Sequence, residues 1–187
     1  MSIVDKAIEI ARDAHKGVFR KWSKTNDLYV VHCQRCVKKA KQLGYDEIEQ
    51  AAMAVHDVFE DVAIPTNTVP YWEGRIRDEC GQEVVDRCWE LTNTSDTKEW
   101  MEKNPNPSRA QKWAANLAHI RVISDKAKRD KMIDRNDNVQ DMANAPLRMK
   151  QKYIPESREL LAECRYTDEI LGNELEQAID ALEKSIY

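Results

Sequence analysis

A chain of 187 residues is long enough to bury a hydrophobic core without disulfides, and we expect residues 1–187 to form one domain. The formal net charge of -4 argues against a general nucleic-acid-binding protein, although a local basic patch could still bind a small polyanion. No apolar run is long enough to span a bilayer, and the first residues lack a secretory signal. Five cysteines without disulfide-framework spacing suit a reducing compartment, so we expect a soluble cytoplasmic protein.

Helical patterns follow one another along the chain, and no strand pattern of any length appears. A first helix is expected after Ser2, which can form a capping box with Asp5, and a second from Val30 to Leu43. Apolar spacing, capping residues and prolines predict further helices over Tyr71–Cys80, Gln82–Leu91, Ser108–Ile123 and Ala127–Met142, with closing helices that start at Pro155 and are capped by Thr167. The sequence therefore predicts an all-α fold.

Two segments interrupt this helical pattern. Between the first two helices, Arg20, Lys21 and Lys24 surround Trp22, a combination that suits a phosphorylated nucleotide because cations bind phosphate and planar groups stack on a base. An ordinary basic loop is the alternative reading of that segment. The stretch from Thr92 to Pro107 is the longest expected loop, and a loop of that length can be a binding lid or disordered.

The stretch from Ala51 to Val62 is expected to be one helix, started by a capping box of Asp46 and Glu49. At about 100° per residue, one arc of this helix is apolar, and the adjoining arc carries His56, Asp57, Glu60 and Asp61. Crowded carboxylates beside a buried face repel one another unless a cation is present, so a divalent metal is the simplest explanation. A solvated polar face is the alternative.

A second polar stripe is expected on the helix from Ala127 to Met142, where Asp134, Asp137, Asn138 and Asp141 are spaced at i, i+4. His32 lies in the first turn of the second helix, where a lone histidine is more often structural than a ligand. Cys33 and Cys36 form a C-x-x-C pair, but no second pair follows at zinc-site spacing, so we expect no chemistry from it.

Four segments together carry a resemblance to a known family: AHKGVFRK, YVVH, AAMAVHDVFED and KMIDRNDN, in this order and at approximately the family's spacing. They resemble the HD-domain alarmone hydrolases, which are the (p)ppGpp 3′-pyrophosphohydrolase domains of the RelA/SpoT type and their stand-alone small relatives. The late segment KYIPESRELL also looks like the closing helices of that family. The resemblance covers nearly the whole chain and implies an HD-domain helical bundle of roughly eight to ten helices.

The resemblance also implies the site residues and their roles. One divalent metal, typically Mn²⁺, would be held by His32, His56, Asp57 and Asp134, a nitrogen and oxygen ligand set that suits such an ion. Glu60 and Asp61 would be the catalytic pair that orients water and transfers protons. The substrate-binding residues would be Arg20, Lys21, Lys131 and Asn138.

Four departures from the family pattern surround the substrate rather than the metal. Leu28-Tyr29 stands where the family has Gly-x-Pro-Tyr, and Val62 stands where Thr is usual. Asp137 occupies a position normally held by His or Tyr beside the nucleotide, and Leu91–Ser95 replaces a Gly-Val-Thr-Lys-like segment. These changes bear on which nucleotide is bound.

We therefore expect an enzyme, a Mn²⁺-dependent phosphohydrolase that removes the 3′-pyrophosphate of (p)ppGpp and leaves GDP or GTP. A hydrolase acting on a 5′-nucleotide or a dNTP, a non-catalytic nucleotide-binding module and a purely structural helical domain are the alternatives. The expected partner is a small nucleotide, with no nucleic acid and no membrane, and a homo-oligomer is left open.

Overall fold

The computed structural model describes residues 1–186, and the α-helices in that range number ten. The only β pairing among these residues is a single antiparallel bridge between Phe19 and Leu28, so the predicted all-α fold is confirmed. The helices are α1 (Ile3–Ala14), α2 (Tyr29–Gln42), α3 (Glu47–Val55), α4 (Val69–Cys80), α5 (Gln82–Leu91), α6 (Lys98–Lys103), α7 (Arg109–Val122), α8 (Asp125–Asp141), α9 (Leu147–Cys164) and α10 (Glu169–Lys184). None of them combines the length and apolar character that a membrane crossing needs.

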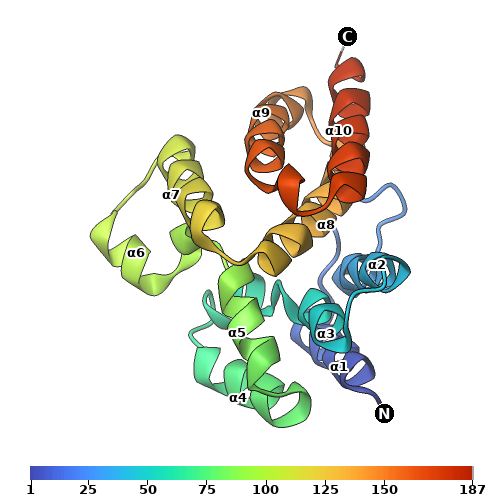
Figure 1. Cartoon of the computed structure of the whole chain (residues 1–187). Coiled ribbons are helices and arrows are strands. Elements are labelled where there is room, and N and C mark those ends of the chain that lie inside the picture. The colour runs from blue at the N-terminus through green and yellow to red at the C-terminus, as the bar shows by residue number, and fades with distance from the viewer. Residues whose placement is uncertain (187) are drawn as a thin grey trace.

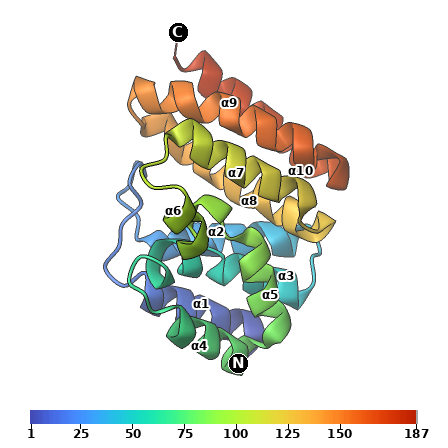
Figure 2. The same cartoon turned by 90° about the vertical axis from the view of Figure 1, so that its left-hand side faces the viewer.

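Helix α3 lies at the centre of one half of the molecule. All five residues from Ala51 to Val55 are fully buried, so the second half of this helix is enclosed on every side. It packs against α1, α2, α5 and α8. Figure 1 shows α1, α3, α4 and α5 gathered near the N-terminus, and α9 and α10 lying against α8 at the other end. Figure 2 shows α7, α8, α9 and α10 stacked across the upper part of the molecule.

The expected single helix from Ala51 to Val62 is wrong, because α3 ends at Val55 and a π-helix follows over Val58–Ala63. The wider turn is visible in the bond from the Ile64 amide to the Phe59 carbonyl, 2.9 Å, which spans five residues. A π-turn changes the direction of each side chain relative to an α-helix, and such turns are frequent at functional sites. Phe59 nevertheless stays fully buried and packs on Trp89, as the apolar pattern requires.

Several helix ends shift by one or two residues from the sequence prediction, and three other segments differ in kind or position. The stretch from Thr92 to Pro107 contains a 3-10 turn and the short helix α6, whose N-cap Thr97 accepts a bond from the Trp100 amide, so it is not one long loop. Pro155 lies inside α9 rather than at its start; it is on the exposed side, where the carbonyl that loses its partner can reach water. The N-cap of α10 is Asp168, one residue after the expected Thr167.

Residues 18–28, called the arm below, connect α1 to α2 across the site. Two backbone bonds of 2.8 Å close the arm, from the Arg20 amide to the Asp27 carbonyl and from the Tyr29 amide to the Val18 carbonyl. Asp27 accepts further bonds from the hydroxyls of Ser23 and Thr25. The arm is therefore an ordered turn that places Arg20 against α8.

Candidate metal centre and adjoining cavity

Four side chains from three parts of the chain converge at the start of the π-helix. His32 comes from α2, His56 and Asp57 from the turn after α3, and Asp134 from α8. One nitrogen or oxygen of each lies within 4.8 Å of those of the other three. These are the four residues that the resemblance implies as metal ligands, and the fold brings them together although His32 and Asp134 lie 102 residues apart in the sequence.

The hydrogen bonds of the two histidines determine which ring nitrogen faces the cluster. His56 Nδ1 lies 2.9 Å from the Met53 carbonyl, which can only accept, so Nδ1 carries the proton. His32 Nδ1 lies 2.6 Å from a carboxylate oxygen of Asp137 and donates in the same way. The two Nε2 atoms then face each other at 3.2 Å. Each presents a lone pair toward the other and toward two carboxylates, which is the donor arrangement of a divalent metal site.

The carboxylates complete the cluster at short range. Asp57 Oδ2 lies 3.3 Å from His32 Nε2 and 3.1 Å from His56 Nε2, and Asp134 Oδ1 lies 3.2 and 3.4 Å from the same two nitrogens. Burial disfavours the charged form of His56, but Asp57 and Asp134 outweigh it and raise its pKa well above the ordinary value. The cluster therefore attracts positive charge, supplied by protons or by a metal ion, and the residues present fit a divalent cation.

Both carboxylates of the cluster are oriented by neighbours. The Tyr29 hydroxyl donates to Asp57 Oδ2 at 2.7 Å, and the Asn138 amide donates to Asp134 Oδ1 at 2.6 Å. Asn138 follows Asp134 by one helical turn on α8, so the i, i+4 stripe read from the sequence is present. Such outer contacts restrict ligand rotation and raise metal affinity.

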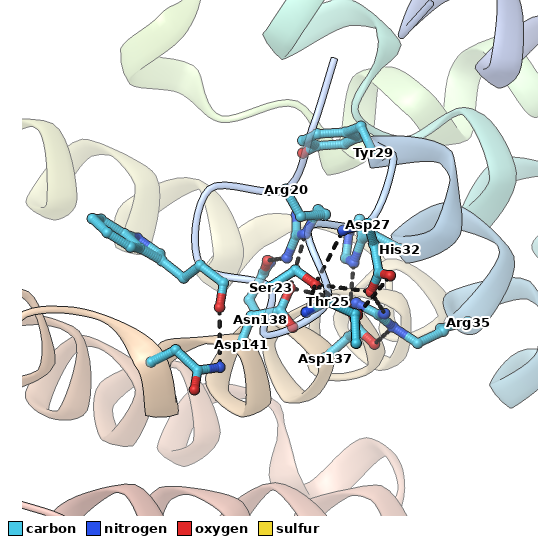
Figure 3. A network of polar contacts seen from close by, with 12 residues as sticks. Arg20, Ser23, Thr25, Asp27, Tyr29, His32, Arg35, Asp137, Asn138 and Asp141 are labelled. Atoms are coloured by element: carbon cyan, nitrogen blue, oxygen red, sulfur yellow. Dashed lines mark hydrogen bonds and ion pairs between the residues drawn. The ribbon is translucent and has the colours of Figure 1, made fainter. Parts of the chain in front are cut away.

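A cavity of about 460 Å³ opens beside the cluster, a size within the range of small-molecule sites. It is lined by His15, Val18, Phe19, Arg20, Lys21, Trp22, Tyr29, Asp61, Val62, Asn138, Asp141, Met142 and Tyr153. Arg20 donates to Asp141 at 3.0 Å and to Asn138 at 2.5 Å, Lys21 lies over the Trp22 ring at 5.1 Å, and Figure 3 shows the Arg20 contacts. Two cations and several aromatic rings thus border the space next to the metal ligands.

The two residues expected to act as a catalytic pair point in different directions. Glu60 is held by Asn93, whose backbone and side-chain amides donate to it at 2.6 and 2.7 Å, and Lys131 lies 3.7 Å away. Burial raises the pKa of Glu60 to about 7. Asp61 lines the cavity, where desolvation and the charge of Asp57 raise its pKa to about 6. Of the two carboxylates, Asp61 therefore lines the cavity and Glu60 does not.

Lys131 is buried on α8 between Glu60 and Asn93, with its nitrogen 3.4 Å from the Asn93 amide oxygen, and it does not line the cavity. Arg135, whose role the sequence left unclear, is enclosed between Trp113 of α7 and Tyr153 of α9, with its guanidinium carbon 5.3 and 4.5 Å from the ring centroids. Arg135 thus connects three helices around the site through cation–π contacts.

Sequence reasoning missed several contributors. Asn93 lies in the departing Leu91–Ser95 segment, and nothing in its spacing indicates a contact with Glu60. Asp137 was expected beside the nucleotide, but it faces α2, where it contacts His32 and Arg35 instead of lining the cavity. No sequence pattern indicated a role for Arg35, because a basic residue on a helix surface is ordinary. A helical wheel of α2 would place Arg35 beside His32, but only the crossing of α2 and α8 makes the contact.

Comparison with known proteins defines the class of fold. No protein-family model matches the chain, and no curated protein matches it. Among solved structures, a chain described as a metazoan ortholog of SpoT that hydrolyzes ppGpp and plays a role in starvation responses matches with a TM-score of 0.77. The match covers 100% of this chain and 98% of that chain at 18% sequence identity. The chain therefore shares the all-α fold of that solved structure over its whole length.

Proposed function

We propose that this protein is a divalent-metal-dependent phosphohydrolase that removes the 3′-pyrophosphate of (p)ppGpp. The observation that carries the proposal is the cluster of His32, His56, Asp57 and Asp134, whose lone pairs converge beside a cavity bordered by cations and aromatic rings. The whole-length fold match to a ppGpp hydrolase supports the same activity. We propose Mn²⁺ as the metal, as the family resemblance implies, and a cytoplasmic location.

A divalent cation held by the cluster would supply Lewis-acid activation of water and of a phosphoryl oxygen. The residues of the chain orient the metal ligands and bind the substrate. Tyr29 and Asn138 orient the two ligand carboxylates, and Arg20 and Lys21 attract the phosphates of the substrate. Trp22 and Tyr153 line the same cavity and offer faces on which a purine can stack.

Proton transfer is assigned to Asp61, and Glu60 supports the site from outside the cavity. Asp61 lies in the cavity with a pKa of about 6, so near neutral pH it is ionised and can accept the proton of the attacking water. The water oxygen bonds to phosphorus, the bond between phosphorus and the 3′-oxygen breaks, and the 3′-oxygen takes up the proton that Asp61 accepted from the water. Glu60 does not line the cavity, and its bonds from both Asn93 amides and its contact with Lys131 hold the segment before Asp61 in place. Pyrophosphate and GDP are the products from ppGpp.

One observation favours a second substrate class. Asp137 stands where the family has His or Tyr beside the nucleotide, and here it is turned toward α2. The base or ribose therefore lacks that contact, and an HD phosphohydrolase acting on a different nucleotide would tolerate the loss. This alternative keeps the metal cluster and changes only what the cavity selects.

Simultaneous replacement of Arg20 and Lys21 by alanine distinguishes the two substrate classes. If (p)ppGpp is the substrate, the double variant has a strongly raised KM for ppGpp, and the wild type prefers ppGpp over GTP, dGTP and GMP in a panel with Mn²⁺. Lys24→Ala is the matched control, because Lys24 lies on the same arm outside the cavity lining. An unchanged KM in the double variant, or preferred turnover of a nucleotide without 3′-phosphates, would instead favour a phosphohydrolase that acts on a different nucleotide.

A further inference from the structure

Asp137 has contacts that the proposed reaction does not use. One carboxylate oxygen, Oδ2, accepts from His32 Nδ1 at 2.6 Å and from Arg35 Nη2 at 2.9 Å, while Oδ1 accepts from Arg35 Nε at 2.6 Å. Arg35 therefore forms a bidentate ion pair with Asp137, and the two parallel bonds restrict the orientation of the carboxylate. Figure 3 shows Asp137 between the His32 ring and the Arg35 guanidinium.

We propose that Asp137 is the positioning residue for His32 in the metal centre, and that it fixes His32 in the tautomer whose Nε2 lone pair faces the cluster. This inference rests on the proposed metal site. His32 is fully buried, so no solvent competes for its ring nitrogens. A carboxylate on the far nitrogen of a ligating histidine holds the ring orientation and raises its basicity, as in other carboxylate–histidine–metal arrangements.

The other histidine of the cluster gives an internal comparison. His56 donates its Nδ1–H to the neutral Met53 carbonyl at 2.9 Å, whereas His32 donates to a charged carboxylate at 2.6 Å. Charge-assisted bonds are shorter and about twice as strong as neutral ones. His32 is therefore the more strongly polarised of the two ligands, and Asp137 is the cause.

The same group of ion pairs continues from the metal ligand to the arm. Arg35 Nη1 lies 3.3 Å from Asp27 of the arm, and Arg35 Nη2 lies 3.4 Å from Asp141, which also accepts from Arg20. The guanidinium that anchors Asp137 is thus itself held by the segment that carries Arg20. These contacts give a matched control: Asp27 is also an acidic partner of Arg35, but it does not touch His32.

The test measures binding of Mn²⁺ alone by electron paramagnetic resonance titration of the metal-stripped protein, without substrate. Asp137→Asn keeps the side-chain volume and removes the charge, so its Mn²⁺ affinity is expected to fall by about 10–100-fold, the usual effect of losing such an outer contact. Asp27→Asn is expected to bind Mn²⁺ like the wild type. Equal affinity in Asp137→Asn and wild type, or an equal loss in both variants, would overturn the inference.

A second readout reports the hydrogen bond itself and does not depend on stability. In the Zn²⁺-loaded protein, the proton on His32 Nδ1 is expected far downfield in a histidine-optimised ¹H–¹⁵N spectrum, and Asp137→Asn should move it upfield while the proton on His56 Nδ1 stays in place. An unmoved His32 signal would overturn the inference. Turnover is scored separately, so a protein that binds Mn²⁺ through an Asp137-dependent site but hydrolyses no nucleotide would refute the proposed function and leave this inference standing.

Discussion

The metal cluster makes a quantitative prediction about thermal stability. The Nε2 atoms of His32 and His56 and the oxygens of Asp57 and Asp134 form one site only in the folded chain, because their elements meet through tertiary packing. A ligand that binds only the native state stabilises it by about 2.7 kcal/mol at about 100 times its Kd. For a chain of this size, about 2.7 kcal/mol corresponds to a rise in Tm of about 5–10 °C.

The assay is differential scanning calorimetry of chelator-stripped protein with and without Mn²⁺. Asp134→Ala removes a ligand that lies near both histidines, so its Tm should not respond to Mn²⁺. Asp125→Asn is the matched control, since it removes a carboxylate from the same helix, outside the cluster, and should keep the full rise. An unchanged wild-type Tm on addition of Mn²⁺, or an equal rise in Asp134→Ala, would show that the four residues do not bind the metal.

Three further predictions concern catalysis, pH and packing. His56→Ala should lose both Mn²⁺ binding and turnover, whereas Glu60→Gln should keep Mn²⁺ binding and lose most turnover; near-native kcat in Glu60→Gln would remove Glu60 from the reaction. Burial raises the pKa of Asp130 to about 8, so the folded state holds its proton more tightly than the unfolded chain, and this stabilising contribution is lost as pH rises from 3.8 toward about 8. Asp130→Asn should therefore flatten the pH dependence of the unfolding free energy between those values in urea titrations, and an unchanged slope would contradict the burial argument. Phe59→Ala should cost about 3–5 kcal/mol of unfolding free energy in the same titrations, because the ring is fully buried, and a cost below about 1 kcal/mol would contradict its place in the core.

Most of the helices follow from local signals. Ser2 and Ser108 cap α1 and α7 with complete capping boxes, and Gln82–Leu91 forms a helix with the predicted ends, because capping and apolar spacing act within a few residues. The capping box predicted for α3 is only half present. Asp46 accepts from the Glu49 amide, but the Glu49 carboxylate is buried and pairs with Arg129 of α8 instead. A tertiary partner thus replaced the local one.

The π-turn after α3 could not be predicted in this way. An α-helical wheel places His56 over Glu60 and Asp57 over Asp61, and either stripe looks like a single polar face. In the structure these residues do not form one polar face, because Glu60 accepts from Asn93 while Asp57 contacts the two histidines. Asn93 and His32 lie more than twenty residues from these carboxylates, so no spacing rule within the helix contains those contacts.

The candidate site was located chiefly through motif order. His32 alone reads as structural, and it became a candidate ligand only through the resemblance; the structure places it against His56 and Asp134. The outer residues escaped detection because their function depends on crossing helices. Arg35 of α2 and Asp137 of α8 meet only where the two helices pack. Motif order can indicate which residues matter, whereas helix packing decides which ones touch.

The measurement that tests the central claim most directly is ppGpp hydrolysis by chelator-treated protein, with and without added Mn²⁺, with separation of the products. GDP and pyrophosphate are expected in equal amounts, and only when the metal is present. Metal-independent turnover, or release of single phosphates in place of pyrophosphate, would contradict the proposed reaction. Tight binding of ppGpp without any product in the presence of Mn²⁺ would contradict it as well, and would identify the chain as a nucleotide-binding module on an HD-domain fold.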